Sequence, residues 1–229
     1  MTRSSTPSVS LPGFESFQRH WDPVHKSQIV KILPGQFYVT RQPEALITTL
    51  GSCVSACIRD ASLGLGGMNH FMLPLNSRDL HAEEDSHPWS IAARYGNFAM
   101  ELLVNAIVRN GGDRRNLEVK IFGGAKIIAH MRQDIGRLNI DFIREYSKIE
   151  ELHVLAEDLG GCYPRKVLYF PATGKARVKR LAPLVSATIA RREAHYRSGL
   201  KKSDFSGGVE LFDDVAVDQR DAENSSAGN

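Results

Sequence analysis

Two short segments carry the residue types of a nucleophilic site. Cys53 ends the run Leu50-Gly51-Ser52-Cys53, and His70 follows it by 17 residues in the run Gly67-Met68-Asn69-His70. A thiol becomes a strong nucleophile when it is ionised, and a nearby imidazole can take its proton. Segments joined by a short Gly-rich connection can lie side by side as strands, so we expect Cys53 and His70 to meet. The chemistry this predicts is attack on an amide or ester carbonyl, followed by hydrolysis of a thioester.

Backbone groups beside the cysteine are predicted to bind the developing oxyanion. Gly51 lets the chain turn tightly, and the N–H groups around Ser52 and Cys53 can then point at the carbonyl oxygen. Ser52 is itself a conceivable nucleophile, but no G-x-S-x-G elbow surrounds it. The pattern therefore favours Cys53 as nucleophile, with Gly51 and Ser52 supplying backbone donors.

Packing is the alternative explanation of the same residues. Free cysteines are among the most buried residue types, and most Cys and His pairs in a sequence never meet in space. Cys57, four residues after Cys53, shares its strand face and is predicted to be a core residue. A metal site of Cys53, Cys57 and His70 is a third possibility, although the sequence lacks paired C-x-x-C knuckles. Spacing alone leaves these interpretations open.

Hydrophobic patterning predicts the elements that position these residues. A helix is expected from a cap at Ser90 to Gly111-Gly112, with an apolar stripe that includes Tyr95, Phe98 and Ile107. Two more helices, broken near Ile135-Gly136, are expected between residues 126 and 152. Strands are expected at 35–40, 45–50, 52–60, 67–74, 117–122, 153–158, 166–170 and 175–181. This order predicts an α+β fold, a sheet or sandwich core flanked by helices, in a single domain.

Composition suggests three parts of the 229-residue chain. Residues 1–29 are rich in Ser and Pro and are expected to be a partly irregular N-terminal extension, residues 30–182 form the domain, and residues 183–229 are a basic helix with an acidic flexible tail. The net charge of +3 conceals this tail: residues 175–202 hold nine Lys or Arg against Glu193 alone, and residues 203–229 hold seven acids against Arg220 alone.

Cysteine usage and hydropathy bear on location. Three cysteines are too few for a disulfide framework, which favours a reducing, cytosolic setting. No stretch approaches the roughly 18 apolar residues of a membrane span, and the N-terminus lacks the apolar region of a secretory signal. We expect a soluble protein of the cell interior.

Longer stretches of the sequence resemble a known family. Around residues 30–182, the chain is similar to the chemoreceptor glutamine deamidase CheD of bacterial chemotaxis. The stretches that carry the resemblance are Thr49–Asp60 (TLGSCVSACIRD), Gly66–Pro74 (GGMNHFMLP), Arg94–Asn97 (RYGN), Lys120–Ala125 (KIFGGA), Asp134-Ile-Gly136 with Asn139, and Ala156–Gly161 (AEDLGG). The LGSC and GGMNH pieces are specific in combination.

The resemblance implies a function and assigns roles. Cys53 matches the family's nucleophile and His70 its catalytic histidine. The implied activity is hydrolysis of selected glutamine side chains to glutamate and ammonia on the cytoplasmic helices of chemoreceptors, which tunes chemotaxis signalling. It implies an α+β fold and a cytoplasmic enzyme, and we expect no cofactor or metal. Receptor helices are the implied partner, and a CheC-type phosphatase is a further candidate partner.

The third residue of the site departs from the family pattern. Where a threonine completes the site in this family, it lies six residues before the cysteine, and Ile47 stands there. Along a strand Thr49 shares parity with Cys53, whereas Thr48 does not. We therefore hypothesise that Thr49 is the third residue.

Other functions and surfaces remain open. A non-enzymatic adaptor that binds receptors or the phosphatase is the main alternative. Nucleic-acid binding through residues 175–202 rests on charge alone, because that stretch resembles an exposed strand followed by a solvated helix. We expect the protein neither to bind nucleic acid nor to insert into a membrane. The polar loop 75–88 is a candidate rim of a substrate groove, and the segment 207–212 is a candidate docking segment.

Overall fold

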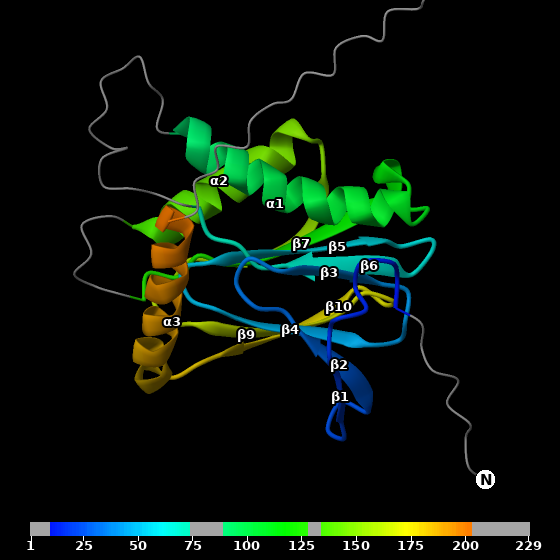
Figure 1. The fold of residues 1–229 in the computed structure, drawn as a ribbon, viewed down its shortest axis with the longest axis horizontal. Helices are drawn as coiled ribbons and strands as arrows, with labels where there is room; N and C mark the ends of the chain where they lie inside the picture. Colours follow the sequence, from blue (N-terminus) through cyan, green and yellow to red (C-terminus); the bar gives the residue numbers. More distant parts are fainter. Residues whose placement is uncertain (1–9, 74–88, 128–133, 203–229) are drawn as a thin grey trace, which may run out of the picture.

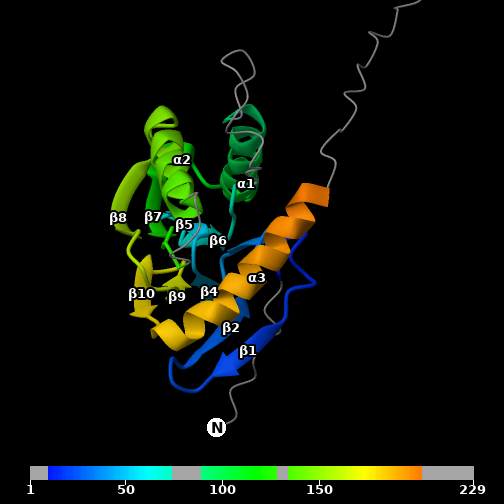
Figure 2. The ribbon, with the colours of Figure 1, turned by 90° about the vertical axis from the view of Figure 1, so that its left-hand side faces the viewer.

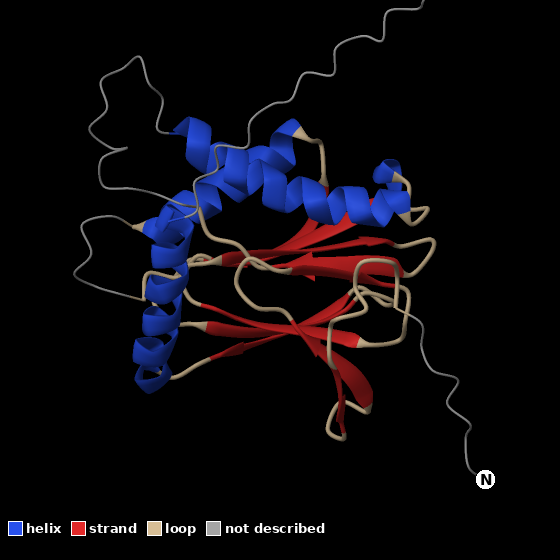
Figure 3. Ribbon diagram, in the orientation of Figure 1, coloured by secondary structure: helices blue, strands red, loops and turns tan. Residues whose placement is uncertain are grey.

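The computed structural model describes residues 10–73, 89–127 and 134–202, and within them two five-stranded sheets stack face to face (Figures 1 and 3). The first sheet has the order β1 (Arg19–Asp22), β2 (Ser27–Lys31), β4 (Ala45–Leu50), β9 (Arg165–Phe170), β10 (Lys175–Arg180). The second has the order β3 (Phe37–Thr40), β6 (Leu65–Asn69), β5 (Val54–Asp60), β7 (Leu117–Gly123), β8 (His153–Leu159). The helices are α1 (Trp89–Arg109), α2 (Ile135–Ile149) and α3 (Pro183–Lys202), with a short 3₁₀ helix η1 (Arg114–Asn116). The α+β prediction is confirmed.

The helices have two different positions. Helices α1 and α2 cover the outer face of the second sheet, whereas α3 crosses one end of the sandwich (Figures 1 and 2). Strands β5 and β6 are buried along almost their whole length, because one face meets the first sheet and the other meets helices. None of the helices in the described part of the chain is long and apolar enough to span a membrane.

Both sheets mix parallel and antiparallel pairs. Strands β2 and β4 are parallel, as are β7 and β8, and the remaining neighbours are antiparallel. A parallel pair needs a crossover connection, and α2 lies in the connection between β7 and β8. Between β2 and β4 the chain crosses to the other sheet as β3. Strand β4 therefore ends in one sheet and β5 begins in the other, with only Gly51, Ser52 and Cys53 between them.

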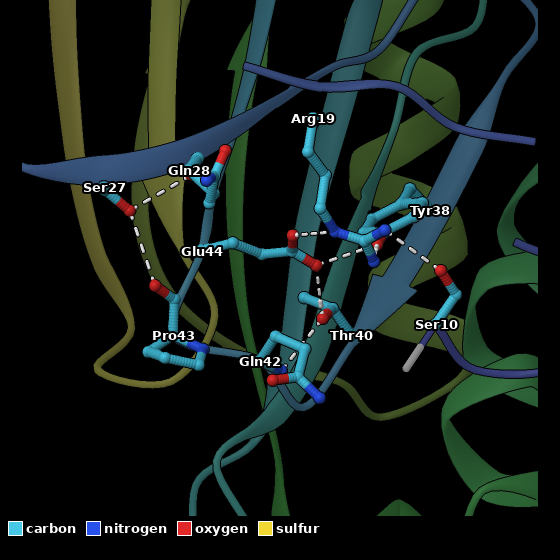
Figure 4. Close-up of polar contacts among 9 residues, drawn as sticks. All are labelled: Ser10, Arg19, Ser27, Gln28, Tyr38, Thr40, Gln42, Pro43 and Glu44. Carbon is cyan, nitrogen blue, oxygen red and sulfur yellow. Dashed lines mark hydrogen bonds and ion pairs between the residues drawn. The ribbon is translucent and has the colours of Figure 1, made fainter. Parts of the chain in front are cut away.

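Part of the expected N-terminal extension belongs to the first sheet. Residues 19–22 and 27–31 form β1 and β2, so the extension expected at 1–29 has regular structure in these stretches. A buried Glu44 fixes this region (Figure 4): its carboxylate accepts from Arg19 Nε at 2.7 Å, Tyr38 Oη at 2.7 Å and Thr40 Oγ1 at 2.6 Å. Arg19 also donates to Ser10 Oγ at 3.0 Å. A buried charge needs such partners, so polar contacts join the segment to the sheet where the sequence shows no apolar period.

The other predicted elements agree with the structure except in a few places. Of the two helices expected between residues 126 and 152, the second is α2, which begins at the predicted break, and the first falls mostly on residues 128–133, outside the described residues. Phe98, assigned to the buried stripe of α1, is 59% exposed. The strand predicted at 67–74 is β6, which ends at Asn69. Loop 75–88 and segment 207–212 lie outside the described residues, and the domain limits at 30 and 182 stay a prediction.

Candidate active site

Cys53 and His70 lie at the same end of two paired strands. Cys53 directly precedes β5, and His70 directly follows β6. The antiparallel register of these strands extends to a bridge between Val54 and Phe71, whose backbone groups exchange two hydrogen bonds of 3.0 Å. In this register Cys53 and His70 fall on one face at diagonal positions, which are within reach of long side chains. Both side chains are buried.

A threonine hydroxyl holds the His70 ring. Thr48 Oγ1 lies 2.8 Å from His70 Nδ1 and 2.8 Å from the carbonyl oxygen of Ile32. A hydroxyl has one proton, and a carbonyl oxygen only accepts, so Thr48 donates to Ile32 and accepts from the imidazole. His70 therefore carries its proton on Nδ1. Its Nε2 is buried and has no hydrogen-bond partner within the described ranges, which leaves a free lone pair for a general base.

The structure places Thr48 at His70, where the sequence favoured Thr49. Thr48 is buried and faces the sandwich core, whereas Thr49 lies on the other face of β4 and is half-buried. The parity argument fails because Cys53 is not in the same strand as the threonines: the chain leaves the first sheet between Leu50 and Val54. Ile47 packs in the small apolar cluster on the outer face of the first sheet. The contacts thus correct the Thr49 hypothesis in favour of Thr48.

Three successive backbone N–H groups converge on one carboxylate beside Cys53. Glu193 of α3 accepts from the N–H groups of Gly51 (2.9 Å), Ser52 (2.9 Å) and Cys53 (3.2 Å). Ser52 Oγ donates to the same carboxylate at 2.6 Å. Convergent N–H groups of this kind form an anion-binding nest, which is the arrangement that an oxyanion requires. The structure thus places the predicted donors of Gly51 and Ser52 together.

The opposite side of this loop explains why its N–H groups point outward. The carbonyl oxygen of Gly51 accepts from Ala125 N at 2.7 Å, and that of Cys53 accepts from Gly124 N at 2.8 Å. The carbonyl of Ser52 accepts from Asn139 Nδ2 at 2.8 Å. Because a peptide N–H points away from its preceding carbonyl, fixing the carbonyls of Gly51 and Ser52 on one side turns the N–H groups of Ser52 and Cys53 to the other. The segment after β7 and the helix α2 therefore build the nest.

Gly51 is required here for space. Its φ is not positive, so the expected tight turn does not depend on the conformational freedom of glycine. A Cβ at this position would lie 2.6 Å from Ile127 Cδ1 and 2.8 Å from Glu193 Oε1. A side chain at position 51 would fill the space in which a carboxylate or an oxyanion binds.

Burial and charge set the protonation of the two central groups. Burial, and then the charge and hydrogen bond of Glu193, raise the pKa of the Cys53 thiol well above its ordinary value. Burial lowers the pKa of the His70 imidazole to about 4, although the Glu193 carboxylate acts in the opposite direction. The thiol and the imidazole are therefore both neutral at pH 7 while Glu193 lies in the nest.

The other two cysteines play no part in this arrangement. Cys57 is buried within β5, as predicted, and Cys162 is exposed. Across residues 10–73, 89–127 and 134–202, no three His, Cys, Asp or Glu side chains cluster in a way that could hold a metal ion.

The sequence interpretation missed two residues of the site. Glu193 lies 140 residues from Cys53, and its only signal is that it is the single acid among nine basic residues in 175–202. Asn139 appeared in the sequence only as part of a stretch that resembles the family, with no role assigned to it. The prediction that the helix at 191–202 is solvated is wrong at Glu193, which is only 6% exposed.

Comparison with known proteins identifies the family of this chain. A family described as CheD chemotactic sensory transduction matches residues 72–180. A relative from Halorhodospira halophila, named probable chemoreceptor glutamine deamidase CheD, is 51% identical over 211 residues, which cover 92% of this chain and 96% of the relative. The chain belongs to the CheD family. The resemblance seen in the sequence is thereby confirmed.

Two further CheD proteins carry the same name. The relative from Hahella chejuensis is 46% identical over 206 residues, covering 90% of this chain and 95% of its own. That from Saccharophagus degradans is 45% identical over 206 residues, covering 89% and 93%. These alignments are longer than the expected domain at 30–182, so the likeness to CheD proteins extends beyond it at one end or both.

Proposed function

We propose that this protein hydrolyses the side-chain amide of selected glutamines on the cytoplasmic helices of chemoreceptors, with Cys53 as nucleophile and His70 as base and acid. The observation that carries this is the nest of three N–H groups at Gly51, Ser52 and Cys53, built directly on the candidate nucleophile. The names of the relatives supply the substrate class. Because the substrate helices are cytoplasmic, the protein would act in the cytoplasm.

The first half of the reaction forms a thioester. His70 Nε2 takes the thiol proton, and the Cys53 sulfur attacks the amide carbon of the glutamine. The carbonyl oxygen becomes negative and lies in the nest, where hydrogen bonds to the charged oxygen are stronger than those to the neutral carbonyl. His70 returns the proton to the nitrogen as the C–N bond breaks, and ammonia leaves.

The second half releases glutamate. A water molecule gives a proton to His70 and attacks the thioester carbon, so that a C–O bond forms and the C–S bond breaks. His70 passes this proton to the sulfur, and the new carboxylic acid releases its own proton to water, which leaves a glutamate carboxylate. Thr48 acts throughout as a positioning residue, because its contact keeps the His70 proton on Nδ1 and leaves Nε2 free.

The test is a map of glutamine conversion on a receptor. A receptor cytoplasmic fragment is incubated with the full chain, and Gln-to-Glu conversion is followed by peptide mass spectrometry. We expect conversion with the wild type and with Cys57→Ala, a matched buried cysteine, and none with Cys53→Ala. Conversion by Cys53→Ala would refute the mechanism. No conversion by the wild type or by Glu193→Ala, which removes the carboxylate from the nest, would favour the adaptor instead.

A CheC-type phosphatase partner remains a prediction within this proposal. Co-purification of the full chain with such a phosphatase, in the presence and absence of the receptor fragment, is the measurement that bears on it.

A further inference from the structure

One face of α3 lies against the candidate site. Ile189 and Glu193 are 5% and 6% exposed, and Tyr196 is half-buried; they are spaced i, i+4 and i+7 along the helix. Their neighbours Arg191 and Arg192 are exposed. This spacing is typical of a helix that lies in a groove, with anchors on one side and polar residues on the other. Figure 2 shows α3 running across the ends of the strands.

The surface beneath α3 has two walls with the nest between them. One wall runs from Lys31 to Pro34 and includes Thr48, Thr49 and His70, and it borders a cavity of about 530 Å³ beside the helix. The other wall contains Met72 and the segment Ala125–Ile127. These residues belong to both sheets and the β7–α2 connection, so the walls do not depend on α3 for their position.

Glycine at two positions lets a helix approach this surface. A Cβ at Gly35 would lie 2.8 Å from Tyr196 Oη, and a Cβ at Gly51 would lie 2.8 Å from Glu193 Oε1. Tyr196 also forms a hydrogen bond with Tyr95 of α1. The fit of α3 is therefore specific, and its anchors are a tyrosine and a glutamate.

We propose that α3 occupies, within the same chain, the groove that receives the substrate helix, and that the Glu193 carboxylate lies where the product glutamate is formed. This rests on the proposed function. Substrate and product are Gln and Glu side chains on a helix, and α3 is a helix that places a Glu side chain on the nest beside Cys53. The bound helix inhibits the enzyme, and a receptor helix must displace it.

The electrostatics of the arrangement in which α3 occupies the groove agree with an inhibited state. The Glu193 carboxylate fills the donors that would hold an oxyanion, so no substrate carbonyl can reach them. Its negative charge also disfavours the Cys53 thiolate, whereas a neutral glutamine amide at the same place would not. A product carboxylate and a transition-state oxyanion compete for the same N–H groups.

Placing the substrate side chain on α3 gives a decisive test. In a Glu193→Gln chain, the amide carbon lies beside Cys53, and the reaction described above needs only water. Cys53 and water convert the amide to a carboxylate with loss of ammonia, which restores the wild-type residue. The purified chain is digested and position 193 is examined by peptide mass spectrometry over time. Gln28, which is exposed on β2, is the internal control glutamine.

We expect conversion at position 193 to be complete well before any change at Gln28, and to be absent when Cys53→Ala is added. A Glu193→Gln chain that deamidates the receptor fragment but leaves its own position 193 intact would overturn the inference while the proposed function stands. If no variant deamidates either the receptor fragment or its own position 193, the proposed function itself is overturned.

Inhibition is measured on the receptor fragment with Glu193→Ala. If α3 fills the groove in nine molecules of ten, removing its anchor lowers the apparent KM about tenfold, because only open molecules bind substrate. The kcat is expected to stay unchanged. Glu145→Ala, an exposed glutamate on α2, is the matched control and should have no effect. A fall in kcat, or an unchanged KM, with Glu193→Ala would overturn the inhibitory role.

Discussion

The contact between Thr48 and His70 leads to a sharp prediction about rate and stability. Thr48→Val keeps the shape of the side chain and removes its hydroxyl, so the Ile32 carbonyl and the His70 Nδ1–H each lose a partner. A buried polar group without a partner costs about 1–3 kcal/mol. The imidazole N–H can turn to the Ile32 carbonyl, which recovers part of this loss. We expect the free energy of unfolding to fall by roughly 2–4 kcal/mol.

The effect on activity follows from the position of the imidazole proton. Without the Thr48 acceptor the ring can turn or place its proton on Nε2, and in either case it loses the lone pair that takes the thiol proton. We expect kcat/KM on the receptor fragment to fall about 10- to 100-fold, which corresponds to about 1.4–2.7 kcal/mol. Loss of the acceptor also destabilises the imidazolium, so the acid limb of the pH profile moves to lower pH.

Two variants separate positioning from structure. Thr48→Ser keeps the hydroxyl and should retain most of the activity, and Thr49→Val changes the neighbouring threonine on the other face of β4. Rates are measured by mass spectrometry and unfolding by urea titration. The reasoning is refuted if folded Thr48→Val has wild-type kcat/KM and an unshifted pH profile, or if Thr49→Val causes the larger loss.

Three further predictions concern stability, loop geometry and pH. Glu44→Gln removes the charge facing Arg19, and we expect a loss of about 2–3 kcal/mol in urea unfolding, since the pair is largely buried; a loss below 0.5 kcal/mol would contradict the role of the network. Asn139→Ala frees the Ser52 carbonyl, and we expect it to lower kcat on the receptor fragment with a smaller change in KM. A change in KM that is larger than the change in kcat would contradict a role of Asn139 in the nest. Because burial lowers the pKa of His70 from 6.5 to about 4, the unfolded state binds more protons in that window, so stability should fall as pH falls through it. Urea titrations across this range should show a smaller pH dependence in His70→Asn, and an equal dependence would disprove the assignment.

The sequence was sufficient for the features that depend on local pattern. The strands at 45–50, 117–122, 153–158 and 166–170 follow from alternating or continuous apolar residues, and the structure contains them as β4, β7, β8 and β9. Cys53 and His70 could be singled out because their residue types carry chemistry and a short Gly-rich connection joins their segments. The donors at Gly51 and Ser52 follow from adjacency to Cys53 in the chain.

Tertiary structure alone decided which groups complete the site. Strand parity pointed to Thr49, but the chain changes sheets between Leu50 and Val54, and side-chain alternation does not carry across that crossing. Glu193 reaches the nest from a helix 140 residues away, and no local pattern encodes such a contact. Asn139 of α2 contributes to the site by donating to the Ser52 carbonyl, which lies in the connection between β4 and β5. The sequence determined the candidate nucleophile, its candidate base and the strands that carry them, because these depend on residue type and short-range pattern. The orienting hydroxyl and the carboxylate in the nest depend on how separate elements pack, and only the folded chain shows this.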